Sequence, residues 1–206
     1  MTKAILAAAA LLAGAGVLAQ EVPSAPSRPA AEIRQLFEAG QYQQVIDAAG
    51  PEAEPAIIYA AVLSHQKLGA ADAASAMAAR LAALPSENGW HFVGLSAGQL
   101  SANQIDEALA SADSAVTIAG TLPQAHHQRG LVLAKRQAWR DAALAFDREA
   151  ELDPMEAYAF YYGGLAHYRA NRSDLMAIRF ERFLKLAPKA PERPEVMQIM
   201  RTIRGR

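Results

Sequence analysis

The sequence predicts an all-α chain in which one pair of antiparallel helices is repeated, and three observations support this fold class. From Ala30 onward, apolar residues recur three and four positions apart, and no run shows the period of two that a half-buried strand needs. Proline and glycine signals separate segments of helical length. Gly69, Asn103, Gln137 and Asn171 follow one another at intervals of 34 residues, at places that suit a left-handed turn between two helices.

Composition restricts the class of protein. The chain has 206 residues, of which 52% are hydrophobic and 20% charged, so it can bury a core. Its formal net charge of -1 argues against a nucleic-acid partner, because neutralising phosphates needs clustered lysine and arginine. The absence of cysteine excludes disulfides and thiolate metal sites.

The first residues have the layout of a secretory signal peptide. Lys3 precedes an uncharged apolar run that ends in Val17-Leu18-Ala19, a small-x-small pattern that signal peptidases cleave. An uncleaved anchor is the alternative, but the run is shorter than the ~20 residues that span a membrane. We therefore expect a signal peptide over 1–19 and a protein that is exported, to the periplasm of a Gram-negative host or to the medium. No membrane span is expected after cleavage. Residues 20–30, rich in proline, serine and alanine, are expected to be a disordered linker.

The repeat itself is predicted over 55–188, in four units at 55–88, 89–122, 123–156 and 157–188. The third unit carries small Gly130, aromatic Trp139, small Ala142, aromatic Phe146 and closing Pro154 at fixed offsets. In this pattern and in its 34-residue period, the chain resembles the tetratricopeptide repeat (TPR) family, of an exported bacterial type. The resemblance implies a right-handed superhelical solenoid, with the first helix of each pair on the concave side.

Both ends of the array differ from the repeat. Residues 31–54 are expected to form an atypical, shorter helix pair that turns at Gly40. Residues 189–206 are expected to form a capping helix and a basic tail. Val196, Ile199, Met200 and Ile203 fall on one face of that helix, which would cover the last repeat.

The resemblance also indicates where a partner would bind. In the family the concave surface is formed by set positions of each first helix, and here many of these positions hold aromatic and basic residues, the types enriched in binding hot spots. About half of the aromatic residues are expected to pack between repeats instead. The predicted groove residues are Tyr59, Lys67, Trp90, Val93, His127, Leu131, Lys135, Tyr158, Tyr161, Tyr168 and Arg169.

No catalytic residue, metal site or cofactor is expected. The adjacent His126 and His127 diverge by ~100° on a helix, so they do not suit one metal ion. His126, Arg129 and Glu149 occupy positions that are apolar or small in the family. Together they suggest a partly buried ionic cluster that stabilises the packing.

The leading functional hypothesis is a non-enzymatic scaffold or adaptor of the cell envelope that binds a peptide or protein segment in its concave groove. The alternative is a structural component that associates with copies of itself. A third, weaker hypothesis is an accessory to an envelope enzyme or a secretion system. The sequence does not identify the partner.

Overall fold

The computed structural model describes residues 29–204, and these residues form helices connected by short turns, without a strand. The predicted signal peptide and most of the predicted linker lie outside the described residues, as do the last two residues of the basic tail. The helices are α1 (Ala30–Glu38), α2 (Tyr42–Ala48), α3 (Pro55–Lys67), α4 (Ala71–Ala82), α5 (Gly89–Ser101), α6 (Ile105–Ile118), α7 (Pro123–Lys135), α8 (Trp139–Leu152), α9 (Ala157–Arg169), α10 (Ser173–Leu186) and α11 (Arg193–Arg204).

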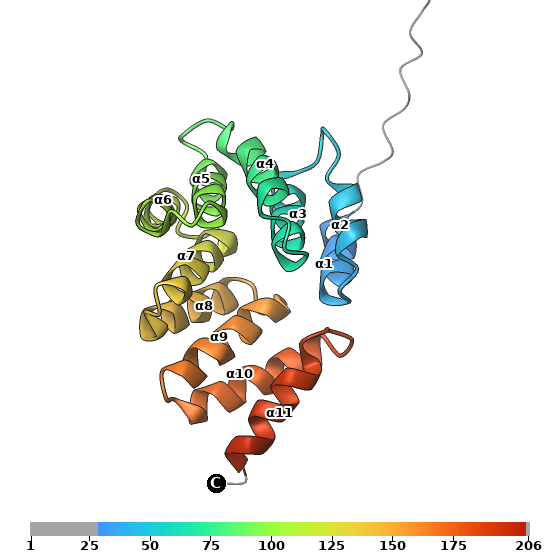
Figure 1. Ribbon diagram of the computed structural model, residues 1–206, viewed down its shortest axis with the longest axis vertical. Coiled ribbons are helices and arrows are strands. Elements are labelled where there is room, and N and C mark those ends of the chain that lie inside the picture. The colour runs from blue at the N-terminus through green and yellow to red at the C-terminus, as the bar shows by residue number, and fades with distance from the viewer. Residues whose placement is uncertain (1–28, 205–206) are drawn as a thin grey trace, which may run out of the picture.

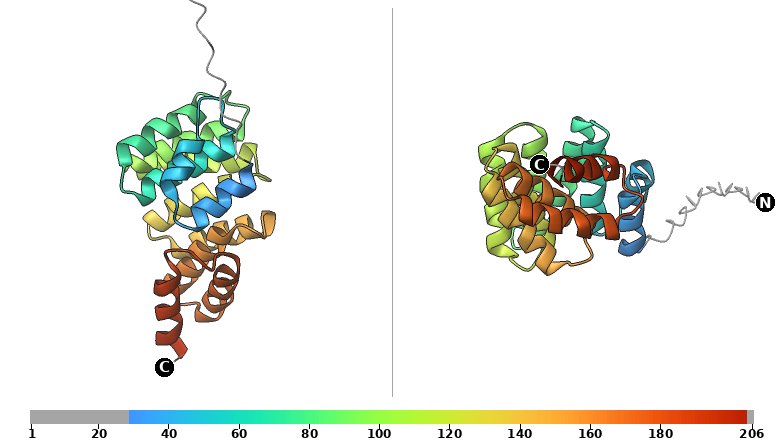
Figure 2. Two further views of the ribbon diagram at one scale, coloured as in Figure 1. Left: turned by 90° about the vertical axis from the view of Figure 1, so that its right-hand side faces the viewer. Right: turned by 90° about the horizontal axis from the view of Figure 1, so that it is seen from below.

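Successive helices pack against each other and form a solenoid along a curved path (Figure 1). The first helices of the pairs, α3, α5, α7 and α9, alternate with the second helices α4, α6, α8 and α10. Because the path curves, α9 and the segment before α11 return toward α1 and α3 at the start of the chain (Figure 1). Figure 2 shows the path from two further sides, with α11 packed beside α10 at the C-terminal end.

The turns between paired helices have the left-handed backbone that their spacing predicts. The φ angles are 72° at Gly69, 60° at Asn103, 62° at Gln137 and 61° at Asn171, and Gly40 repeats this geometry at 72° in the first pair. Each turn residue donates its backbone N–H three residues back, which satisfies a helix-terminal carbonyl. The recurring turn is what returns the chain antiparallel.

Small residues let the paired helices approach closely. Ala74, Ala108 and Ala142 recur at the predicted interval and are fully buried. Gly94 lies so close to the preceding pair that a Cβ there would meet the backbone N of Ala82 at 2.5 Å. The alanine column and Gly94 therefore determine the distance between neighbouring helices, as expected for residues with a structural role.

The last helix covers the end of the array. Val196 is fully buried and Met200 is 8% exposed, and Ile199 and Ile203 pack against the same core, so the apolar face predicted for this helix is confirmed. The core that α11 joins also contains Ile33 and Phe37 of α1. Among the described residues, no helix is both long and apolar enough to cross a membrane.

Candidate functional site

The structure divides the eleven predicted groove residues into three groups. Five of them are buried, three are partly buried and three are exposed. The buried ones line the interior of the curved path, where they have no surface for a partner in this conformation. The buried residues are Tyr59, Val93, His127, Tyr158 and Tyr161. The partly buried residues are Lys67, Trp90 and Leu131, and the exposed residues are Lys135, Tyr168 and Arg169.

Lys67 is the centre of a cluster that joins distant parts of the chain. Its Nζ donates to Glu192 at 2.6 Å, and lies 4.9, 5.5 and 5.3 Å from the ring centroids of Tyr158, Tyr161 and Tyr162. The hydroxyl of Tyr158 donates to the same Glu192 at 2.7 Å. We call these five residues the closing cluster. It connects α3 to α9 and to the segment before α11, and so fills part of the concave side with the protein's own side chains.

Helix α1 makes a second connection across the concave side. Arg34 donates to Asp153 at 2.6 Å and lies 3.6 Å from Glu156. One turn later, the ring of Phe37 meets that of Tyr158 edge to face, with centroids 4.9 Å apart. A Cβ at Gly40 would lie 2.6 Å from Cγ of Pro191, so the turn after α1 touches the segment before α11. The solenoid is therefore closed by contacts between its first and last elements.

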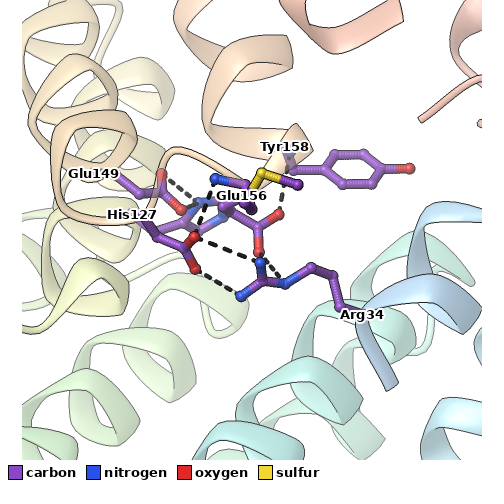
Figure 3. Close-up of polar contacts among 7 residues, drawn as sticks. Arg34, His127, Glu149, Glu156 and Tyr158 are labelled. Atoms are coloured by element: carbon purple, nitrogen blue, oxygen red, sulfur yellow. Dashed lines mark hydrogen bonds and ion pairs between the residues drawn. The ribbon is translucent and has the colours of Figure 1, made fainter. Parts of the chain in front are cut away.

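Beside these contacts lies a partly open cavity of about 100 Å³, which we call the inner cavity. Its walls come from α1, α3, α7, α8 and the start of α9. Figure 3 shows Arg34 extending from α1 toward Glu156, with His127 and Glu149 nearby. The lining residues are Ala30, Ile33, Arg34, Phe37, Ala56, Ile57, Tyr59, Ala60, Leu63, Gln124, His127, Glu149 and Glu156.

His127 and Glu149 form a buried pair at this cavity. Nδ1 of His127 lies 2.8 and 2.9 Å from the two carboxylate oxygens of Glu149, and the residues are 2% and 3% exposed. Burial opposes the imidazolium, but the carboxylate of Glu149 outweighs it and raises the pKa of His127. Nε2 of His127 is buried without a hydrogen-bond partner anywhere in the described chain.

The predicted ionic cluster of His126, Arg129 and Glu149 is wrong. Nε2 of His126 contacts the carbonyl of Gly120 at 2.9 Å, and Arg129 binds Asp113 at 2.6 Å near the surface. Neighbouring residues on a helix point in different directions, and it is the next histidine, His127, that faces Glu149.

Two further carboxyl groups beside the cavity have pKa values near neutrality. The pKa of Glu156 is raised to about 7, first by burial and then by the charge of Glu149. The pKa of Glu38 is also raised to about 7, first by burial and then by the charge of Glu156, while Arg34 acts in the opposite direction. The interior of the closed solenoid thus carries more carboxyl groups than cations to pair with them.

A separate hollow of about 340 Å³ stays open on the concave side, at the C-terminal ends of α3, α5 and α7. We call it the open groove. Leu131 and Lys135, both predicted groove residues, lie in it beside Leu100 of α5. Lys135 is exposed and has no ion-pair partner within residues 29–204. The open groove is lined by no acidic residue; its lining residues are Gln66, Gly69, Ala71, Leu100, Ser101, Leu131 and Lys135.

The exposed predicted residues of the last repeat lie elsewhere. The guanidinium of Arg169 is 5.8 Å from the ring of Trp139, and both line a shallow hollow at the turns after α7 and α9. Tyr168 is 38% exposed. The structure therefore does not bring all eleven residues into one groove.

Sequence reasoning missed the contacts that close the solenoid. Arg34 and Asp153 are 119 residues apart, and Lys67 and Glu192 are 125 apart. None of these pairs recurs at the repeat interval, so the register gives no signal for them. No group of three or more metal-ligating side chains comes together in the described part of the chain.

No family model matches the sequence, and no curated protein matches it with significance. Solved structures do match. TTC0263, described as a thermophilic TPR protein in Thermus thermophilus, is 18% identical with a TM-score of 0.60, over 84% of this chain and 96% of that one. The crystal structure of MamA is 16% identical with a TM-score of 0.50, over 74% of this chain and 90% of that one. The fold is therefore a helical solenoid of the TPR type.

Proposed function

We propose that this chain, with its TPR-type fold, is a non-enzymatic scaffold that binds an extended segment of another protein in the open groove. The segment carries apolar side chains and at least one carboxylate. The open groove is the observation that carries this proposal, because it is a part of the concave side that stays accessible beside the closing cluster.

The chemistry of the groove suggests the character of the segment. Leu100 and Leu131 offer apolar surface, and Lys135 offers an unpaired cation at its edge. An extended chain leaves its backbone groups free to bond with water or with polar groups such as Gln66 and Ser101. An acidic residue near Lys135 would gain a charge-assisted hydrogen bond, worth about 1.5–3 kcal/mol when well formed.

The cell envelope is the proposed location. The support comes from the sequence, whose first residues have the layout of a secretory signal peptide. The proposal assigns no catalytic step to the chain.

Site-specific photo-crosslinking tests the proposal. A photoreactive amino acid replaces Leu131 in the groove or, as a control, Leu144, which is 66% exposed on the second helix α8. Both proteins are irradiated in envelope extract. We expect a partner that crosslinks from position 131 and not from 144, and whose yield falls about tenfold in Lys135→Glu. Lys185→Glu, the same charge reversal at an exposed position of α10, should keep the yield.

Other outcomes would overturn the proposal that the partner binds in the open groove. A partner that crosslinks only from position 144 binds the outer surface. Crosslinks only between copies of this chain favour the self-associating structural component. A yield that falls equally in Lys185→Glu reflects net charge and not the groove.

A further inference from the structure

The inner cavity shares no lining residue with the open groove, so an inference about it stands independently of the proposed function. Its size suits a compact guest. A buried water needs about 10–15 Å³ on a comparable measure, so about 100 Å³ holds several water-sized groups. Ile33, Phe37, Ile57 and Leu63 make part of its lining apolar, and Glu149 and Glu156 add carboxyl groups. This is the amphipathic lining typical of small-molecule sites.

Carboxyl groups outnumber cations around the cavity. Glu149 and Glu156 line it, and Asp153 and Glu38 lie close enough to influence their charges. The cations on the same side are Arg34, which is bound to Asp153 and lies 3.6 Å from Glu156, and His127, which is bound to Glu149. Lys67 is committed to Glu192 in the closing cluster. The carboxylates around the cavity repel one another, and burial strengthens this repulsion. A guest that brings a positive charge would therefore reduce it.

His127 provides an independent observation. When its ring is neutral, Nδ1–H donates to Glu149, which leaves the lone pair of Nε2 as an acceptor. This nitrogen is buried and without a partner in the described chain, although buried polar groups in proteins are almost always paired. His127 also lines the cavity, so an N–H donor that reaches Nε2 from there would provide its missing bond.

We propose that the inner cavity binds a compact organic cation, an ammonium or guanidinium group on a short apolar stem. The N–H groups of the cation donate to the carboxylate of Glu156 and to Nε2 of His127. The stem lies against Ile33, Phe37 and Leu63. The source is either a free small molecule or a lysine or arginine side chain inserted by a partner.

Binding and protons compete in this site. Binding of the cation needs an ionised Glu156 and a neutral His127, so protonation of either group weakens binding. The pKa of Glu156 is about 7 and that of His127 is raised above its usual value, so affinity increases as pH rises through 7. The charged and titratable groups that face the site are Arg34 and Glu38 of α1, Tyr59 and Lys67 of α3, His127 of α7, Glu149 of α8, and Asp153 and Glu156 between α8 and α9.

Calorimetry and histidine NMR on the full chain test the proposal. The probes are n-propylammonium and n-propylguanidinium, with neutral n-propylurea as the matched control. We expect one or both cations to bind more tightly at pH 8 than at pH 6 and to shift the Nε2 resonance of His127. The neutral urea should not bind. Glu156→Gln keeps the oxygen that caps Tyr158 and should weaken binding at least about tenfold. Glu151→Gln, on the exposed side of α8, should not change it.

The outcomes separate the sources and decide the proposal. An acetylated Ala-Arg-Ala amide that binds as well as the free guanidinium supports a partner's side chain as the source. A free cation that binds while the tripeptide does not supports a small molecule. Equal binding of the urea, unchanged binding in Glu156→Gln, or no binding of either cation would overturn the proposal. Crosslinking at position 131 is unaffected by these results, so the two proposals can fail separately.

Discussion

At the scale of single residues, two glycines of α5 allow the effect of packing on stability to be distinguished from the effect of helix propensity. Gly94 and Gly98 lie one turn apart in the same helix. A Cβ at Gly94 would lie 2.5 Å from both Ala82 N and Leu81 Cβ, whereas at Gly98 the nearest atom is 3.8 Å away. The backbone cannot move aside easily at the first position, so the two alanine substitutions should have opposite effects.

We predict that Gly94→Ala destabilises the protein by about 1–3 kcal/mol through overpacking. Gly98→Ala should stabilise it by about 0.5–1 kcal/mol, because alanine restricts the unfolded chain. Urea denaturation followed by circular dichroism measures both. Equal effects of the two substitutions would show that the close approach at Gly94 does not limit the packing.

Glu38 gives the stability of the fold a dependence on pH. Its pKa is raised from 4.5 to about 7 in the folded chain, so folding favours the protonated form. The resulting stabilisation is fully present below pH 4.5 and is lost as pH rises through 7. Glu38→Gln should therefore raise stability at pH 8, by roughly 1 kcal/mol after solvent screening, and leave it unchanged at pH 4.5.

Thermal unfolding at the two pH values measures this effect, with Glu32→Gln at an exposed position of the same helix as a control. A gain of about 1 kcal/mol corresponds to a melting temperature higher by about 2–4 °C. If Glu38→Gln lowers stability at pH 8, its carboxylate is stabilised by Arg34 more than it is penalised by burial.

At the scale of elements, the repeat register predicted the turns well and the contacts between distant elements not at all. Gln137 has a left-handed backbone although glutamine has no preference for it, and only its place in the 34-residue column indicated the turn. The columns at Ala74, Ala108 and Ala142 were equally readable, because each repeat meets its neighbour in the same way. No repeat has an acidic residue at the position equivalent to Glu192, so its contact with Lys67 required the folded chain.

The Lys67–Glu192 contact should be energetically coupled. The two side chains are 21% and 11% exposed, and three tyrosine rings surround the ammonium. A double-mutant cycle with Lys67→Met and Glu192→Gln should give a coupling of about 1–3 kcal/mol. Arg148 and Glu151, an exposed pair within α8, should give less than about 0.5 kcal/mol in the same cycle. Coupling energies of similar size would mean that the closing cluster is no stronger than a surface ion pair.

At the scale of the whole molecule, the path of the solenoid decides which concave residues a partner can reach. Sequence reasoning placed Tyr158 and Tyr161 on an open surface, because in a repeat array each first helix faces inward. The curvature of the array and the position of α1 are properties of the complete chain, and they bury both tyrosines under Phe37 and Lys67. Lys135, further along the curve, stays exposed as predicted.

If contacts between the ends hold the solenoid in this shape, removing one of them should open it. Phe37 is 8% exposed and contacts Tyr158 directly, so Phe37→Ala removes apolar contact from the closure and leaves the repeats α5 to α8 untouched. The chain has no cysteine, so Gln44→Cys in α2 and Lys189→Cys before α11 provide two unique sites for spin labels. The distance distribution between the labels should become longer and broader in the variant.

Phe92→Ala removes the same ring from α5, away from the ends, and should lower stability without changing the distance between the labels. An unchanged distribution in Phe37→Ala would mean that the curvature belongs to the repeats themselves, with Phe37 filling a space that the helices already define. A longer distance in both variants would mean that loss of packing anywhere loosens the array. Only a change confined to Phe37→Ala identifies α1 as the element that keeps Tyr158 and Tyr161 covered.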